Sequence, residues 1–265
     1  MKKFLIYTRS DNEKINKAVM DLAGMIRKKG GWAGTDLSSS YDAVISLGGD
    51  GTMVDASKYA VRLGLPSIGV NLGHLGYLCD LDEKNLEEGV ERLLKDDFET
   101  ERRMMLEGES CDGKEFTALN DVVIASSAGL NIINLSVFID NNFLCSYNCD
   151  GIIFATPTGS TAYNLSADGP IVDPTTEVIL LNPVNAHTLN SRAIVLDPGN
   201  EISVTLNQRH ENQDEEAMVF IDGEKAGSLG PGESFRVKRS CLHAEMIRFS
   251  ELNFLQRISS RLNEV

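Results

Sequence analysis

The chain has 265 residues, of which 42% are hydrophobic and 24% charged, proportions that are typical of an ordinary globular protein. Its 25 basic and 39 acidic residues give a net charge of −14 at neutral pH. This acidic balance argues against nucleic acid or an anionic membrane surface as a main partner. It leaves phosphorylated small molecules open, because backbone N–H groups bind phosphate without any net positive charge.

Targeting and redox features are few. The first apolar stretch runs only from Phe4 to Tyr7, whereas a signal peptide needs an apolar segment of about 7–15 residues. No stretch of the sequence approaches the ~20 apolar residues of a membrane-spanning helix. The five cysteines are odd in number and scattered, which does not indicate a disulfide framework. We therefore expect a cytoplasmic protein with reduced thiols.

In the first hundred residues, short apolar runs alternate with segments of helical periodicity. A short apolar run bounded by polar residues or glycine is typical of a buried strand, and apolar spacing of three and four is typical of an amphipathic helix. The alternation predicts a Rossmann-like α/β domain over residues 1–100, with a mostly parallel sheet and helices on both faces. The expected strands are 4–8, 43–47 and 66–71, and the expected helices are 12–30, 52–64 and 84–95.

After residue 100 the pattern changes to short alternating segments separated by turn residues. Asp112-Gly113 and the run from Asp140 to Asn142 are typical of hairpin turns. The pattern predicts a β-rich domain over residues 101–240, with antiparallel sheets in a sandwich-like arrangement. Residues 241–265 return to helical periodicity, and we expect this C-terminal segment to pack back on the first domain.

A glycine-rich turn, Gly48-Gly49-Asp50-Gly51, joins the second expected strand to its helix. Ligands bind at the carboxyl ends of strands in open α/β sheets, and glycines let backbone N–H groups and a helix N-terminus approach phosphate. A carboxylate in this turn can accept a proton from an attacking hydroxyl or help to hold magnesium. The structural alternative is that Asp50 caps the helix beginning near Thr52. The spacing alone favours neither of these two roles for Asp50.

A second polar stretch, NCDGIIFATPTGSTAYNLSADGP, covers residues 148–170. Between Thr156 and Ser166, small hydroxyl side chains suit polar contacts with a ligand, and the Tyr163 ring could stack on a base. The structural alternative is a hairpin loop rich in serine and threonine. The roles of Asp150 and Asn120 have the same two interpretations, since each residue could bind a ligand or only shape a turn.

Five stretches in this order resemble the NAD kinase family: GGDGT, NLGHLGYL, ALND, DGIIFATPTGSTAYNLSADGP and NAHTLNSR. The likeness runs from Asp42 to about Arg192, and more loosely to the C-terminal end. GGDGT alone is weakly specific, because diacylglycerol kinases, sphingosine kinases and phosphofructokinases carry similar loops. TPTGSTAYNLSADGP is far more specific, and its pairing with GGDGT decides the prediction.

The resemblance implies phosphorylation of the 2′-hydroxyl of the adenosine ribose of NAD by ATP, which gives NADP. It implies Asp50 as general base, Mg²⁺ or another divalent cation as cofactor with ligands unknown, and a homodimer or homotetramer. The phosphate loop would be Gly48, Gly49, Gly51 and Thr52. The implied NAD contacts are Asp50, Gly51, Tyr77, Asn120, Asp121, Asp150, Thr161, Ala162, Tyr163, Asn164 and Ser166. His187 and Asp222 are weaker matches to the family's pattern.

Two rival functions remain at this point. A lipid kinase of the diacylglycerol or sphingosine type would share the glycine turn, but it would need an apolar lipid slot and a membrane-directed surface. A non-catalytic dinucleotide-binding module would share the polar stretch, but it would have no need of Asp50. Turnover with ATP and NAD separates these rivals from an NAD kinase.

Overall fold

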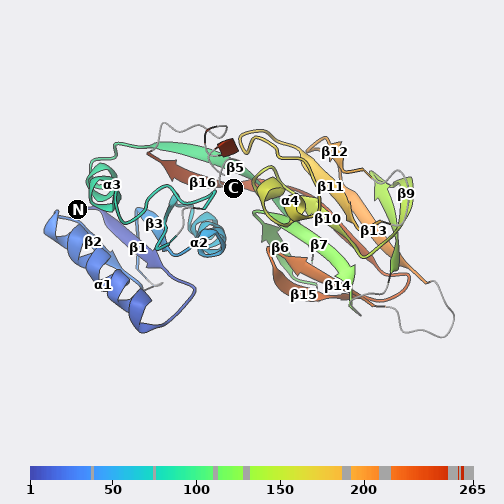
Figure 1. Cartoon of the computed structure of the whole chain (residues 1–265), viewed down its shortest axis with the longest axis horizontal. Coiled ribbons are helices and arrows are strands. Elements are labelled where there is room, and N and C mark those ends of the chain that lie inside the picture. The colour runs from blue at the N-terminus through green and yellow to red at the C-terminus, as the bar shows by residue number, and fades with distance from the viewer. Residues whose placement is uncertain are drawn as a thin grey trace. The chain divides into compact units, whose positions relative to one another are not determined.

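The computed structural model describes residues 1–36, 39–73, 76–109, 113–127, 132–186, 192–208, 216–249, 256 and 258–259. The chain divides into two compact units, residues 1–103 together with 243–265, and residues 104–242 (Figure 1). The helix predicted for the C-terminal end lies almost wholly outside the described residues. Among the described helices, none is long and apolar enough to span a membrane. The four cysteines within the described ranges are free thiols.

The first unit is built on a parallel sheet. Its strand order is β2-β1-β3-β4-β16, and each neighbouring pair is parallel. The predicted mostly parallel sheet is therefore confirmed. The strands are β1 Lys3–Tyr7, β2 Trp32–Gly34, β3 Ala43–Leu47, β4 Ser67–Val70 and the end of β16, Ser234–Arg248. The helices are α1 Glu13–Lys28, α2 Asp50–Leu63 and α3 Leu86–Leu94.

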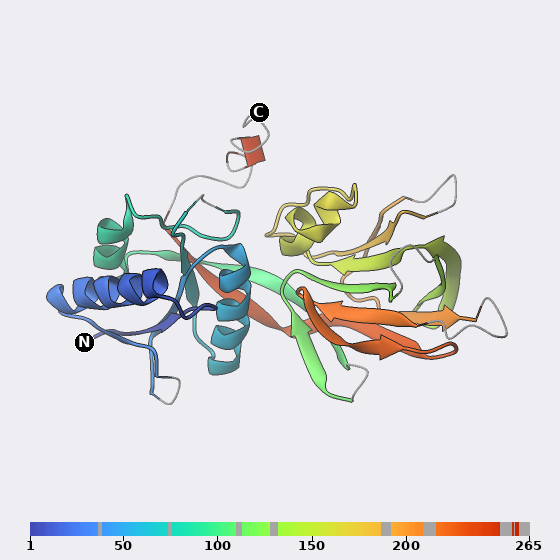
Figure 2. The same cartoon turned by 60° about the horizontal axis from the view of Figure 1, so that its bottom comes forward.

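Helices cover both faces of this sheet, as the alternation of strand side chains requires. On one face, Ile6 and Ile45 pack in a cluster with buried residues of α1 and α3. On the other face, Leu5 and Val44 pack against Ala56 of α2. Figure 2 shows the strands of the sheet passing between α1 and α2. This layering leaves the carboxyl ends of the parallel strands as the edge on which a ligand site would form.

The second unit contains two antiparallel sheets. One has the order β12-β11-β10-β7-β14-β15, and the other contains β16, β13, β8 and β9, with β5 and β6 joined to it. The strands of the first sheet are β7 Asp121–Ser126, β10 Gly151–Ala155, β11 Ile179–Val184, β12 Ile194–Leu196, β14 Ala217–Ile221 and β15 Glu224–Leu229. Those of the second are β5 Glu99–Glu109, β6 Glu115–Ala118, β8 Ile133–Ile139, β9 Asn142–Cys149 and β13 Ile202–Asn207. The predicted antiparallel β-rich body is confirmed.

The core of the second unit lies between its two sheets. Phe154 of β10 and Leu181 of β11 belong to one buried cluster with Leu135 of β8 and Val204 of β13. The opposite face of β10 is also buried, because Ile153 packs in a cluster that includes residues after α4. The stretch after β10 folds as a short 3₁₀-helix, Thr158–Thr161, followed by α4, Tyr163–Ser166. These helical turns replace the hairpin loop that was the structural alternative for this stretch.

Candidate active site

Asp50 lies in the first turn of α2, at the carboxyl end of β3. Gly49 is the N-cap residue of this helix, so the capping role weighed for Asp50 is wrong. The Asp50 carboxylate instead accepts two backbone hydrogen bonds, from the N–H of Tyr77 (2.8 Å) and from the N–H of Leu78 (3.1 Å). Hydrogen bonds to a carboxylate are charge-assisted and strong. The side chain is therefore fixed by a segment that follows β4, the next parallel strand of the sheet.

Two glycines make room for this arrangement. A Cβ atom at Gly76 would overlap the carboxylate of Asp50. A Cβ atom at Gly48, whose φ is +155°, would lie 2.5 Å from Oγ1 of Thr52. Both positions thus require glycine for a steric reason that involves the predicted site residues themselves.

Arg9 is a residue at this edge that the sequence did not single out. It follows β1, and its Nη1 lies 3.0 Å from the position that a Cβ atom at Gly51 would occupy. Its Nε forms an ion pair with Oδ2 of Asp55 at 2.5 Å. The only sequence signal for it was its place after a strand neighbouring β3, since parallel strands end at the same edge.

In the second unit, Asp222 holds the segment that contains Asn120 and Asp121. Its carboxylate accepts the N–H groups of Leu119 (3.0 Å), Asn120 (2.7 Å) and Asp121 (3.2 Å). Its own N–H donates to the carbonyl of Asp121 (3.0 Å). Asp222, a weak match at the level of sequence, is thus the residue that shapes this turn.

The turn after β10 packs directly on that segment. Thr156 Oγ1 donates to the carbonyl of Leu119 (2.6 Å) and accepts the N–H of Gly159 (3.0 Å). A Cβ atom at Gly159 would overlap the backbone of Asn120, so the two segments touch without room for a side chain. Asn120 Oδ1 is buried and has no hydrogen-bond partner among the described residues. A buried amide oxygen without a hydrogen-bond partner is rare, and such an oxygen is suited to accept a hydrogen bond from a bound ligand.

The remaining residues of the polar stretch differ in exposure. Thr161 and Ala162 are half-buried, Ser166 is exposed, and Tyr163 is 47% exposed. Asn164 is fully buried, and its amide is used inside the fold. Its Nδ2 donates to the carbonyls of Ser160 (3.2 Å) and Pro170 (3.1 Å), and its Oδ1 accepts from Asn182 Nδ2 (3.1 Å). A direct contact between Asn164 and NAD stays a prediction.

Asp150 is separated from the other predicted residues of the second unit. It precedes β10, whereas Thr156 follows that strand, and six residues of extended chain span roughly 20 Å. Its Oδ2 accepts a hydrogen bond from Nδ2 of Asn185 (2.9 Å). The structure therefore brings Asn120, Asp121 and the turn after β10 together, but it does not bring Asp150 to them. His187 lies outside the described residues.

Asp121 carries a perturbed carboxyl group at the start of β7. The residue is 5% exposed, and burial, with a smaller contribution from the charge of Asp222, raises its pKa to about 7. Burial disfavours the charged form, and a neighbouring carboxylate has the same effect. A proton on this carboxyl at moderately acidic pH would make it a hydrogen-bond donor.

This pKa predicts a pH-dependent penalty to stability. An aspartate in the unfolded chain ionises near pH ~3.9, whereas folded Asp121 keeps its proton up to about pH 7. The stability that this bound proton contributes is therefore fully present below pH ~3.9 and is lost as the pH rises through about 7. The amide side chain of the variant Asp121→Asn cannot ionise. We expect the free energy of unfolding of the variant, relative to the wild type, to rise by roughly 2–3 kcal/mol between pH ~5 and ~8. Urea unfolding at both pH values measures this, and an unchanged difference would contradict it.

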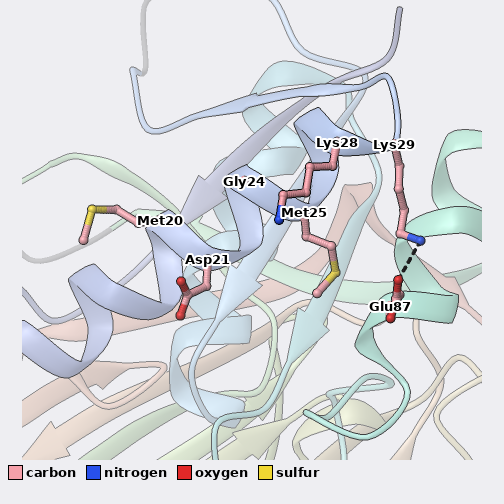
Figure 3. A pocket seen from close by; sticks show the side chains of 7 residues that line it. All are labelled: Met20, Asp21, Gly24, Met25, Lys28, Lys29 and Glu87. Atoms are coloured by element: carbon pink, nitrogen blue, oxygen red, sulfur yellow. Dashed lines mark ion pairs between the residues drawn. The ribbon is translucent and has the colours of Figure 1, made fainter.

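A pocket beside α1 does not contain any of these residues. It is lined by Met20, Asp21, Gly24, Met25, Lys28, Lys29 and Glu87 (Figure 3). An ion pair of 2.9 Å between Lys29 Nζ and Glu87 Oε1 connects α1 to α3 at its edge. None of the predicted site residues lines this pocket, so the candidate active site lies elsewhere.

The described residues offer no cluster of three or more His, Cys, Asp or Glu side chains that could hold a metal ion. At the glycine turn, the Asp50 carboxylate lies in the first turn of α2. One carboxylate, completed by the phosphate oxygens of a substrate, is a common way in which proteins bind Mg²⁺.

A glycine turn with a fixed carboxylate, at the carboxyl edge of a parallel sheet, defines an arrangement suited to phosphoryl transfer. Residues 32–98 match the ATP-NAD kinase N-terminal domain, and residues 119–249 match the ATP-NAD kinase C-terminal domain. The NAD kinase of Agathobacter rectalis is 41% identical over 229 residues, 86% of this chain and 81% of the relative. That of Ruminiclostridium cellulolyticum is 35% identical and covers 100% of this chain and 99% of the relative. The chain belongs to the NAD kinase family.

Two solved structures share the fold. Yeast NADH kinase complexed with NADH superposes with a TM-score of 0.88 at 20% identity, over 100% of this chain and 89% of that chain. An NAD kinase from Archaeoglobus fulgidus in complex with ATP gives a TM-score of 0.80 at 22% identity, over 100% of both chains. These likenesses establish the fold class that the sequence pattern predicted.

Proposed function

We infer that this chain transfers the γ-phosphoryl group of ATP to the 2′-hydroxyl of the adenosine ribose of NAD and so produces NADP. Membership of the NAD kinase family supports this activity. The observation that carries it is the Asp50 carboxylate, which two backbone N–H groups hold in a glycine turn at the carboxyl end of β3. We assign Asp50 the role of general base.

The geometry of Asp50 suits that role. Each carboxylate oxygen has two lone-pair positions, and the N–H groups of Tyr77 and Leu78 take one position on each oxygen. The remaining positions can accept the proton of a ribose hydroxyl, which is a poor nucleophile near neutral pH. The first-turn N–H groups of an α-helix lack intrahelical acceptors, so those at Gly51 and Thr52 can bind phosphate oxygens.

Besides Asp50, Gly51 and Tyr77 of the first unit, the second unit supplies groups proposed to bind NAD. Asn120 Oδ1 is buried and accepts no hydrogen bond from the described residues, and the Asn120 backbone contacts the turn after β10. An amide oxygen of this kind can accept a hydrogen bond from a nucleotide's N–H or O–H group. The exposed ring of Tyr163 can stack on a base, a contact worth ~1–3 kcal/mol in other nucleotide-binding proteins. Thr161, Ala162 and Ser166 lie on the same short segment.

We propose that a divalent cation such as Mg²⁺ enters with the phosphates of ATP, with Asp50 as the protein carboxylate nearest to it. When it is bound, such a cation neutralises charge on the transferring phosphoryl group. The location in the cytoplasm and the homodimeric or homotetrameric state are further proposals that rest on the sequence and its family resemblance.

The test is an incubation of the purified protein with Mg-ATP and a panel of NAD, NADH, sphingosine and diacylglycerol. We expect conversion of NAD to NADP, detected by an NADP-specific dehydrogenase, and loss of the reaction when EDTA is added. Phosphorylation of a lipid with NAD untouched would replace this function with the lipid kinase. Binding of NAD without turnover would favour the non-catalytic module.

A further inference from the structure

Arg248, at the end of β16, contacts the segment that holds Asp50. Its Nη1 donates to the carbonyl of Leu78 (2.9 Å), and its Nε donates to Oε2 of Glu101 (3.2 Å). The same guanidinium lies 3.6 Å from Oδ1 of Asp80, whose side chain is fully buried. The cation therefore sits between two carboxylates and a backbone carbonyl.

The segment from Tyr77 to Leu81 is fastened on both sides. On one side, the N–H groups of Asp80 and Leu81 donate to the carbonyl of Gly69 in β4, each at 3.1 Å. On the other side, Asp80 Oδ2 accepts the N–H of Phe249 (2.7 Å), directly after Arg248. The segment is therefore hydrogen-bonded both to β4 and to the end of β16. These two strands are parallel neighbours, in which Met246 pairs with Ser67.

Leu78 is the residue at which this network meets the active site. Its N–H donates to Asp50 Oδ1 (3.1 Å), and its carbonyl accepts from Arg248 Nη1 (2.9 Å). A partly buried hydrogen bond at each end of one residue restricts its backbone torsions. Any movement of the Leu78 carbonyl would be transmitted through that residue to the N–H that fixes Asp50.

We propose that Arg248 is a positioning residue for catalysis, which aims the backbone N–H groups of Tyr77 and Leu78 at the carboxylate of Asp50. This inference rests on the proposed function, because it assigns Arg248 an effect on the step that Asp50 performs. A planar guanidinium is needed, since it donates in two fixed directions at once, to Leu78 and to Glu101. A lysine ammonium keeps the charge but lacks this fork of donors.

The test compares Arg248→Lys with a matched control, Glu101→Gln. The control removes the charge that pairs with Arg248 and with Arg103, but its amide oxygen can still accept from Arg248 Nε, and the Arg248 bond to Leu78 stays in place. We expect Arg248→Lys to lower kcat by about 10- to 100-fold with KM for NAD nearly unchanged, because small misplacements at a reacting centre cost rates of this size. We expect Glu101→Gln to lower the Tm and to retain kcat, measured well below both melting temperatures.

A second readout does not depend on turnover. Hydrogen exchange at the amides of Tyr77 and Leu78, followed by NMR, should be faster in Arg248→Lys and unchanged in Glu101→Gln. Equal losses of kcat in both variants, or unchanged kcat and exchange in Arg248→Lys, would overturn the inference. If Arg248→Lys does not fold, Asp80→Asn weakens the same attachment, and an unchanged kcat there would overturn it equally.

Asp50→Asn assayed in parallel separates the two proposals. Full turnover by Asp50→Asn would refute the proposed role of Asp50. The exchange rates of the Tyr77 and Leu78 amides would still show whether Arg248 holds this segment. Inactivity of Asp50→Asn together with wild-type kcat in Arg248→Lys would overturn only the positioning role.

Discussion

Replacing Asp50 with asparagine is expected to lower kcat at least about a hundredfold, roughly the lower bound for loss of a general base. The amide cannot accept the hydroxyl proton, although it has nearly the volume of the carboxylate. Because the contact surface for NAD is otherwise unchanged, the Kd for NAD should stay close to that of the wild type. Steady-state turnover and calorimetric NAD binding measure the two quantities.

The structure also predicts a cost in stability for this variant. Two backbone N–H groups donate to the two oxygens of Asp50, and asparagine has only one oxygen to offer them. One N–H group would then face an amide NH₂, which costs about 1–3 kcal/mol when the donor is buried. We therefore expect a moderate fall in Tm beside the loss of turnover.

Asp42→Asn is the matched control for Asp50→Asn. Asp42 also accepts a backbone N–H, from Lys3 at 2.7 Å, but it stands before β3, at the strand end opposite Asp50. The variant Asp42→Asn should have a lower Tm than the wild type and an unchanged kcat. Retained turnover in Asp50→Asn would remove this residue from the mechanism, and equal turnover losses in both variants would point to a general disturbance of the sheet.

The second large effect is expected for Gly76→Ala. A methyl group at this position would overlap the Asp50 carboxylate, so either the side chain or the segment that carries Tyr77 and Leu78 has to move. Displacement of the Asp50 carboxylate should lower the rate as much as misplacement of a substrate does, on the order of 10²-fold. We expect kcat to fall by about that factor while most of the protein remains folded.

Gly73→Ala is the control for Gly76→Ala, because it makes the same change three positions earlier. The nearest atom to a Cβ there is Asn71 Oδ1, at 3.8 Å, which is an ordinary contact. Its N–H bond to that oxygen, 2.8 Å, is kept by alanine. Near-normal turnover in Gly73→Ala with inactive Gly76→Ala supports the steric argument, whereas active Gly76→Ala would show that Asp50 tolerates displacement.

Much of the fold could be predicted because its signals are local. The apolar runs around Ile45 and Ile68 and the periodicity of the helix before Gly30 predicted parallel strands between helices, and these elements are present. GGDGT could be placed at the end of a strand for the same reason. The first residue of α2 differed from the expected start, since Asp50 itself is helical and Gly49 is the cap.

What the sequence could not predict are contacts between distant residues. Asp50 is held by N–H groups 27 and 28 positions away, Asp222 holds residues 101 to 103 positions away, and Arg248 reaches the carbonyl of Leu78, 170 positions away. No local pattern indicates such partners. Asn164 illustrates the same limit, because its motif did not indicate that its amide oxygen accepts a hydrogen bond from Asn182, 18 positions away.

The first unit is discontinuous in the chain, since residues 1–103 are completed by residues from 243 onward. During synthesis, which proceeds from the N-terminus, β4 can acquire its outer parallel neighbour only after β16 has been made. A ribosome that adds about 5–20 residues each second needs roughly 7–30 seconds to pass from residue 103 to residue 243. Throughout that interval the sheet edge at β4 is bare, and Leu78 has no Arg248 to hold it. The nascent chain is therefore exposed to strand-mediated association until β16 emerges, and catalytic competence arrives only then.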